Sequence, residues 1–353
     1  MTTRTRYFVI TSLVVLGGGL GTALVAYYAG FPMSAVGRRG GPEELRFVSR
    51  NASVVAYANV AALMNSELRR KVHAAVPMSE NGQREFQDET GINIETDLEY
   101  VIGFISPETE SNGVPSGGGP HGFNGGGMVL ARGVFDSGKI EALMREHGAH
   151  VESYKGKRLI VAGLHMGDSA DTQPAPTGAK DGFALAFVEP GLAAVGSASL
   201  VRASIDNQAT GQNATANDDL MTRVRSLEGG TAWAVGRFDA ILAQARRLPA
   251  NVASQIPPIT WFSINSHING GISGLVKAET RDEESANNLR DVVRGFMALA
   301  KLQAGSKSEY QTMMQSLELG GSGKTVVLKF MVPSEVFDVI GKATKGLSAK
   351  PGH

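Results

Sequence analysis

The sequence predicts an α+β protein, built mainly of antiparallel sheet with helices packed on one face and preceded by one transmembrane helix. Pairs of segments with alternating apolar residues are joined by short glycine-containing turns, as in β-hairpins. Segments with apolar residues at helical spacing separate these pairs. Hairpins separated by helices favour an antiparallel sheet whose helices share a face. An uncharged apolar segment precedes all of these elements.

That uncharged segment, Tyr7 to Phe31, is predicted to be a signal-anchor helix. At about 1.5 Å per residue it covers a hydrocarbon core of about 30 Å. Arg4 and Arg6 in the short tail 1–6 place the N-terminus in the cytoplasm by the positive-inside rule. Residues 32–44 form a tether. We therefore expect a protein of the inner (cytoplasmic) membrane, with its main domain in the periplasm or outside the cell.

Two other interpretations of the N-terminal segment fit its residues less well. A cleaved signal peptide has a shorter apolar stretch, although Ser34 to Gly37 resembles a weak cleavage site. A dinucleotide-binding loop is suggested by the glycines in Val14 to Gly21. Such a fold requires an amphipathic helix and a later acidic residue, whereas the residues that follow are apolar on every side. A retained anchor is the favoured interpretation.

Residues 45–345 are predicted to form the extracytoplasmic α+β region, followed by a flexible tail, 346–353. In the first half, alternation predicts strands at 54–60, 100–106 and 128–134, with hairpins at 151–161 and 183–195. Helices are predicted at 61–75, 137–147 and 199–208, and glycine-rich loops at 108–127 and 167–181.

The pattern restarts in the second half, so the region would divide into halves 45–210 and 211–345 if it is an internal repeat. A strand at 231–237 enters a helix at 238–247, and hairpins are predicted at 260–279 and 317–332. The longest helix is predicted at 282–304 and a closing helix at 333–342. Apolar residues at helical spacing define the predicted buried face of the longest helix: Leu289, Val292, Val293, Phe296 and Ala300.

Three phrases of the second half, GGTAWAVGRFDAI, PPITWFSINSHINGGISG and MMQSLELGGSGKTVVLKF, carry a resemblance to a known group of proteins. They resemble uncharacterised, membrane-anchored envelope proteins of bacteria such as acidobacteria, mostly over residues 229–337. The resemblance implies anchoring and a bacterial source. It transfers no activity, cofactor or site residue.

Composition excludes several classes of function. Lys plus Arg and Asp plus Glu are equal at 34 each, so no overall field attracts nucleic acid, and no nucleic-acid partner is predicted. The chain has no cysteine, which excludes disulfides, thiolate metal sites and cysteine nucleophiles.

The phrase Gly320 to Thr325, GGSGKT, ends like a phosphate-binding loop. The motif requires an earlier glycine where Glu318 stands, and a helix after the lysine. The residues that follow, Val326 to Phe330, alternate like a strand. A hairpin turn is therefore predicted, and no nucleotide is expected to bind.

Other chemical motifs have structural interpretations. His147 and His150 lie three residues apart, as zinc ligands could, but Gly148 separates them and a helix end is predicted. Oxygen side chains alternate from Asn93 to Glu99, as in a calcium loop, but the required glycine is missing, and a capped short helix is predicted. Trp233 and Trp261 are predicted to pack in the core.

No catalytic, cofactor-binding or metal-binding residue is assigned, and no cofactor is expected. The leading hypothesis is a non-catalytic, membrane-anchored envelope protein whose α+β region binds a protein partner or supports a membrane complex. One alternative is an envelope hydrolase with an unrecognised site, which a cluster of Ser, His and acidic residues would favour. The other is a protein that binds lipid or another small molecule, which a large apolar cavity would favour.

Overall fold

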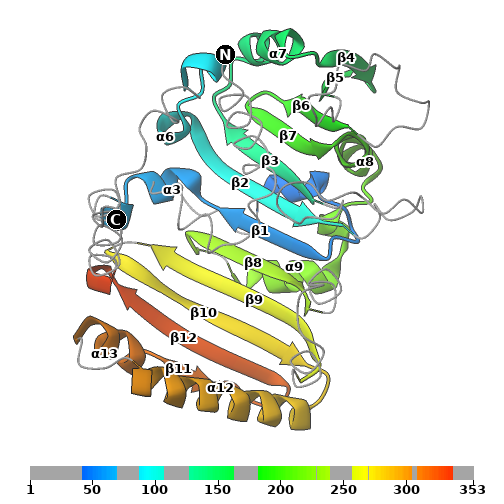
Figure 1. Cartoon of the computed structure of the whole chain (residues 1–353). Helices are drawn as coiled ribbons and strands as arrows, with labels where there is room; N and C mark the ends of the chain where they lie inside the picture. Colours follow the sequence, from blue (N-terminus) through cyan, green and yellow to red (C-terminus); the bar gives the residue numbers. More distant parts are fainter. Residues whose placement is uncertain are drawn as a thin grey trace, which may run out of the picture. The chain divides into compact units, whose positions relative to one another are not determined.

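The computed structural model describes residues 42–69, 87–106, 127–162, 182–227, 229–238, 257–268, 270–303 and 308–336 (Figure 1). They form helices and strands in which the paired strands of each unit run antiparallel, confirming an α+β fold with a mainly antiparallel sheet. The chain divides into two compact units. Unit 1 contains 42–52 and 81–218, and unit 2 contains 53–80 and 219–353. The predicted halves differ from this division, because residues 53–80 group with the C-terminal unit.

The sheet of unit 1 has the strand order β2-β3-β7-β6-β5-β4. The hairpins predicted at 151–161 and 183–195 form, and Lys155 and Gly156 in the first and Gly191 in the second adopt positive φ. The strand bounds are β2 Leu98–Ile105, β3 Gly127–Gly133, β4 His150–Tyr154, β5 Lys157–Ala162, β6 Phe183–Glu189 and β7 Leu192–Ser197.

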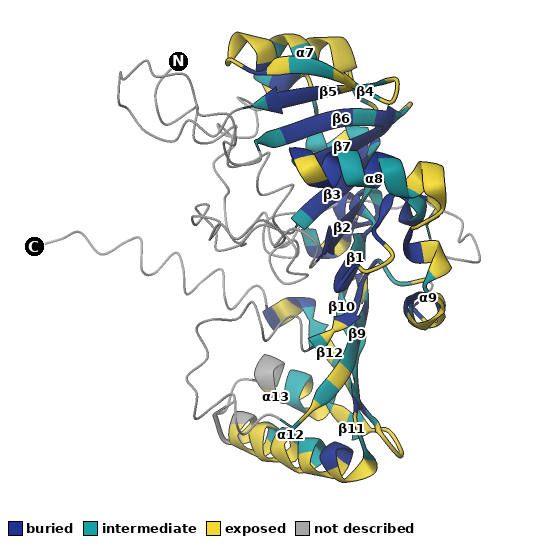
Figure 2. Cartoon of the chain, turned by 90° about the vertical axis from the view of Figure 1, so that its right-hand side faces the viewer, coloured by how far each residue is buried: buried dark blue, intermediate teal, exposed yellow. Residues whose placement is uncertain are grey.

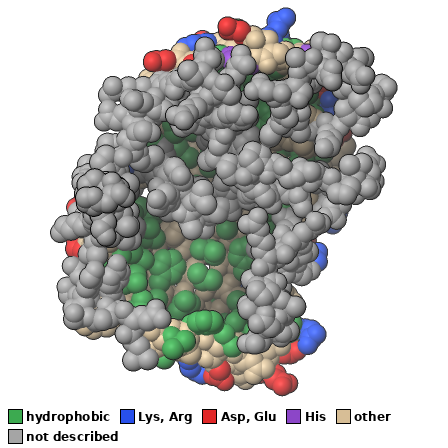
Figure 3. Space-filling view, in the orientation of Figure 1, with side chains coloured by type: hydrophobic (Ala, Val, Ile, Leu, Met, Phe, Trp, Pro, Cys, Tyr) green, Lys and Arg blue, Asp and Glu red, His purple; other side chains and the backbone are tan. Residues whose placement is uncertain are grey.

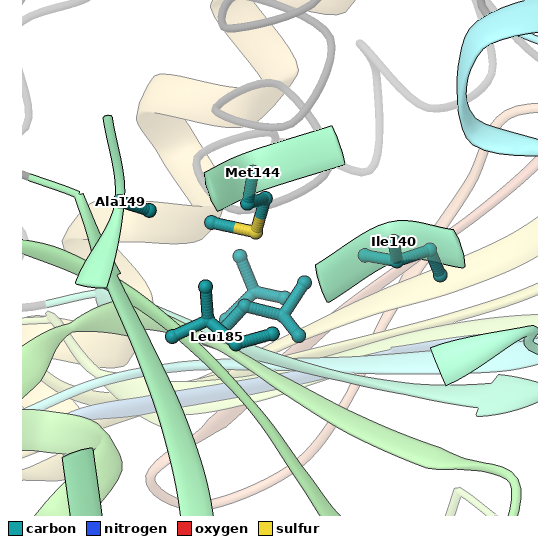
Figure 4. Packing of buried hydrophobic residues seen from close by; sticks show 6 residues of the cluster. Ile140, Met144, Ala149 and Leu185 are labelled. Atoms are coloured by element: carbon teal, nitrogen blue, oxygen red, sulfur yellow. The ribbon is translucent and has the colours of Figure 1, made fainter. Parts of the chain in front are cut away.

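Helices cover both faces of this sheet, which corrects the prediction of one covered face. Helix α7 (Ser137–Glu146) packs on the face that carries Ile160 and Leu185. Figure 4 shows Ile140 and Met144 of this helix lying over Leu185. Helix α8 (Ala198–Thr210) contacts the other face, since Arg202 and Asp206 bind Glu152 and Tyr154 of β4.

The first described segment of the chain is part of the core of unit 1. The 3-10 helix η1 (Glu43–Phe47) buries Leu45 and Phe47, and Ser204 of α8 donates a hydrogen bond to the Phe47 carbonyl at 2.7 Å. Glu44, with its side chain 4% exposed, accepts hydrogen bonds from Arg132 of β3. Short helices complete unit 1: α6 (Ile94–Asp97) and η3 (Ala214–Ala216).

The sheet of unit 2 has the order β11-β12-β10-β9-β8-β1. The strand bounds are β1 Val54–Ala58, β8 Ala232–Arg237, β9 Ile259–Ile268, β10 Gly271–Thr280, β11 Glu318–Gly320 and β12 Thr325–Pro333. Ser316 protects the edge of β12, because its hydroxyl bonds both the N–H and the carbonyl of Met331 at 2.9 Å. These bonds satisfy backbone groups that an edge strand would otherwise expose.

Helices again lie on both sides of the unit 2 sheet. Helix α9 (Asp218–Arg225) lies on one side and α12 (Glu283–Gln303) on the other (Figure 2). Helix α3 (Val60–Met64) follows β1 and is capped by Asn59, and α13 (Ser308–Gln315) contacts β12. Helices α9 and α13 were not predicted from the sequence.

Within the residues that the structure describes, no helix is long and apolar enough to cross a membrane. The predicted span Tyr7 to Phe31 lies outside those residues, and so do the predicted loops and most of the helices predicted at 238–247 and 333–342. The membrane anchor stays a prediction.

Candidate functional site

The GGSGKT phrase forms a hairpin, as predicted. Leu319 of β11 pairs with Leu328 of β12, and the Thr325 N–H donates to the Ser322 carbonyl at 3.0 Å to close the turn. Arg290 of α12 donates to the carbonyls of Gly323 and Thr325. A strand follows Lys324 where a phosphate-binding loop requires a helix.

The two candidate metal motifs are helix ends. The backbone N–H of His147 caps α7, and its Nδ1 lies 2.7 Å from the Leu143 carbonyl. Asn93 caps α6 through a hydrogen bond to the Glu95 N–H, while Asp97 accepts from the Asn93 N–H. Both structural interpretations are confirmed. Among the described residues, no three His, Asp or Glu side chains gather in a way that could hold a metal ion.

The two tryptophans pack within unit 2. Trp233 is 4% exposed and stacks on Tyr57, with ring centroids 5.5 Å apart. Trp261 lies beneath Arg223 of α9, whose guanidinium carbon is 4.3 Å from the ring centroid. The predicted core role is confirmed for Trp233, and Trp261 is half-buried beneath a helix.

The register of unit 2 separates two faces with different chemistry. Side chains of paired strand residues lie on the same face, and successive residues alternate. The polar face carries Glu279, which bonds both Arg223 at 2.5 Å and Lys277 at 2.9 Å. Burial would raise the pKa of Glu279, but hydrogen bonds from Arg223 and Lys277 outweigh burial and lower it.

The other face, which we call the apolar face, carries no charged side chain on β9, β10 and β12 between residues 262–268, 272–278 and 326–332. Its members are Phe262, Ile264, Ser266, Ile268, Ile272, Gly274, Val276, Ala278, Val326, Leu328, Phe330 and Val332. The face continues onto β8 through Ala232, Ala234 and Gly236. Figure 3 shows hydrophobic side chains gathered on this side of unit 2.

Two phenylalanine rings lie across glycines of the neighbouring strands on the apolar face. A Cβ atom added at Gly274 would lie 3.0 Å from Cζ of Phe330. A Cβ atom added at Gly236 would lie 2.9 Å from Cε1 of Phe262. Each ring thus fills the space above a residue without a side chain, which makes the surface smoother.

Ser266 is the one polar side chain within these stretches of the apolar face. Its hydroxyl donates to the Ala232 carbonyl at 3.1 Å, so its proton is already used. Most residues of the face are only half-buried, although Ile268 and Val326 are buried. Among its described residues, the apolar face carries apolar side chains that can contact apolar groups, and it carries no acidic or basic side chain.

Unit 1 contains an apolar cavity of about 50 Å³ between α7 and the sheet. Its lining includes Phe135 and Phe187, whose ring centroids are 6.0 Å apart, and Ile140, Leu143 and Met144 of the helix. A space of this size holds only one or two methyl-sized groups, so it is a packing defect of the core.

Comparison with known proteins adds little to this geometry. No family model matches the chain, and no curated protein matches it. Among solved structures, crystal form I of TP0453 is similar, with a TM-score of 0.43 and 9% sequence identity. The match covers 86% of this chain and 99% of that chain. A similarity at this level supports no conclusion about function.

From the sequence, no residue of the apolar face was assigned to a site. The sequence predicted the strands and their alternation, which was the available signal. The alternation of a single strand shows only that the strand has two faces. The register between strands was needed to show that the uncharged faces of β9, β10 and β12 coincide.

Proposed function

We propose that this chain is a single-pass, membrane-anchored extracytoplasmic binding protein whose apolar face holds the acyl chain of a lipid. The proposal depends on one observation, the uncharged face shared by β9, β10 and β12. It replaces the protein-binding role that the sequence favoured with the lipid-binding alternative. The anchor at residues 7–31 would hold the binding unit beside its source of ligand.

The chemistry of the face favours an acyl chain over a polar ligand. A polar small molecule needs convergent hydrogen-bonding groups to fix its orientation. The hydroxyl proton of Ser266 is used within the sheet, and the charged groups Lys277 and Glu279 lie on the opposite face. A saturated chain needs no polar partner, only apolar surface removed from water.

The expected affinity is modest. If a chain and the protein together bury about 400 Å² of apolar area, the gain is about 10 kcal/mol. Association costs about 4 kcal/mol or more, which leaves about 6 kcal/mol and a Kd of tens of micromolar. Such an affinity suits reversible capture of a lipid from a nearby membrane.

The experiment uses the chain from Glu43 to His353, once cooperative unfolding has shown that it folds. A fluorescent fatty acid is titrated and then displaced with oleate. Phe330→Asp places a charge on the apolar face and should weaken binding about tenfold or more, because burying an unpaired charge costs well over 1.4 kcal/mol. Lys329→Asp changes the adjacent residue on the other face and should leave affinity within about twofold.

Val276→Thr is a milder variant that keeps the shape of the side chain and adds one hydroxyl to the face. It should weaken binding less than Phe330→Asp does. Absence of fatty-acid binding by the parent chain, or equal losses in the Phe330 and Lys329 variants, would contradict the proposal. A protein partner that copurifies with the parent chain and is lost only in Phe330→Asp would instead support the protein-binding role.

A further inference from the structure

Two positions of the apolar face pair a glycine directly with a phenylalanine on the neighbouring strand. Gly274 of β10 pairs with Phe330 of β12, and Gly236 of β8 pairs with Phe262 of β9. In each pair the ring lies close to where a side chain of the glycine position would stand, since an added Cβ atom would approach it to 3.0 Å at Gly274 and 2.9 Å at Gly236. An aromatic side chain that covers a glycine of the next strand fills such a gap in a sheet.

These rings determine what surface the apolar face offers to a ligand. A residue without a side chain leaves its backbone bare and would form a notch between its neighbours. At Gly274 the sides of that notch would be Ile272 and Val276, the adjacent residues of β10 on the same face. The other members with short side chains on β9, β10 and β12 are Ser266 and Ala278, and each keeps its own Cβ atom. With both rings in place, the glycine notches are closed.

A face with closed notches contacts a straight chain better than a branched one. A straight saturated chain has a uniform width, so each of its methylene groups can touch the face. A methyl branch directed at the face has no notch to enter, and it lifts the neighbouring groups away from the protein. A separation of only about 0.5–1 Å already loses about a quarter to a half of the dispersion attraction between two atoms. The face therefore discriminates between chains by their shape.

We propose that Phe330 and Phe262 make the apolar face selective for unbranched acyl chains. The inference rests on the acyl-chain binding proposed above and names the class of chain that is bound. Phe330 is the residue to test, because it and Gly274 are both half-buried. Gly236 is buried, and a Cβ atom added there would also approach the carbonyl oxygen of Ser53. Removal of the Phe330 ring would open a notch above a bare backbone.

The test compares palmitate with phytanate, a saturated fatty acid with a main chain of the same length that carries methyl branches. Each acid displaces a fluorescent fatty acid from the full chain in lipid nanodiscs. Nanodiscs without protein correct for the partition of each acid into lipid.

Phe330→Ala removes the ring over Gly274. Leu328→Ala is the matched control, because it removes a large apolar side chain from the same strand and face, while its partner Val276 keeps a side chain. Cooperative unfolding in urea first shows that each variant folds. Phe330→Leu is the second variant, since a leucine covers Gly274 only in part.

The parent chain should bind phytanate about threefold to tenfold more weakly than palmitate. In Phe330→Ala, palmitate should lose affinity because the ring no longer contacts it, while phytanate can place a methyl branch in the notch. The ratio of the phytanate Kd to the palmitate Kd should therefore fall by about threefold or more. In Leu328→Ala this ratio should stay within about twofold of the parent value, and in Phe330→Leu it should lie between those of the parent and Phe330→Ala.

Equal affinities of the parent chain for the two acids would overturn the proposal, and so would equal shifts of the ratio in Phe330→Ala and Leu328→Ala. A parent chain that binds neither acid would overturn the proposed function and this inference with it. Palmitate binding with a Kd of about tens of micromolar, but with an unchanged ratio in Phe330→Ala, would overturn only the selectivity. The two failures are therefore distinguishable.

Discussion

Phe330 lies across Gly274 on the apolar face of unit 2, with the two residues paired directly in the register of β12 and β10. A Cβ atom at Gly274 would lie 3.0 Å from Cζ of the ring and closer still to the backbone oxygen of Asn265. The glycine therefore permits both the close approach of β9 and the position of the aromatic ring. This pair allows the Phe330 ring to lie against the backbone of the neighbouring strand.

Gly274→Ala should destabilise the protein by about 1–3 kcal/mol, because the added methyl group has no room and forces the strand or the ring to move. The measurement is the urea midpoint of unfolding. Gly320→Ala is the control, since an added Cβ there meets nothing within 4 Å and φ is not positive. Equal midpoints for the two variants would show that the strands adapt without cost.

Arg132→Met should cost about 3–5 kcal/mol, because it leaves the carboxylate of Glu44 buried without its cation. The side chains of Glu44 and Arg132 are 4% and 21% exposed. Arg281→Met breaks an exposed pair with Asp282, whose side chains are 73% and 45% exposed, and should cost less than about 1 kcal/mol. Similar losses in the two variants, measured by urea unfolding, would disprove the structural role of the buried pair.

Protonation of the Glu44 carboxylate should contribute to the loss of folding stability in acid. Burial would raise the pKa of Glu44, but hydrogen bonds with Arg132 and Tyr100 outweigh it and lower the pKa below its ordinary value of 4.5. A lowered folded-state pKa contributes stability above the unfolded pKa, and this contribution is lost as the pH falls below about 4.5. Unfolding free energies measured from pH 7 to pH 3 should therefore decline more steeply for the parent protein than for Glu44→Gln. Parallel curves would contradict the lowered pKa.

Neither the parent chain nor Lys324→Ala should bind ATP or GTP. The substitution should change the free energy of unfolding by no more than about 0.5 kcal/mol. A phosphate-binding lysine needs a following helix whose N–H groups face the anion, whereas Thr325 begins a strand paired with β10. Equilibrium dialysis with labelled ATP and GTP provides the measurement. Micromolar nucleotide affinity that disappears in Lys324→Ala would refute the hairpin as the resting structure of this phrase.

The sequence alone determined the local structure of much of the described chain. Alternation and glycine-containing turns predicted the hairpins at 151–161 and 260–279, because these signals act between residues close in sequence. It did not predict α9 or α13, whose apolar residues are few and whose burial depends on a sheet formed elsewhere in the chain.

The tertiary structure decided which faces meet and which remain open. Helical spacing gave α12 a wide apolar arc, and Val292 and Phe296 were wrongly predicted to be buried, since they are 41% and 68% exposed. The hydrogen bonds of Arg290 to the β11-β12 turn, together with the packing of Ala286, select the side of the helix that faces the protein. Periodicity fixes the angle between side chains within one element, but only contacts between distant elements fix its rotation and register.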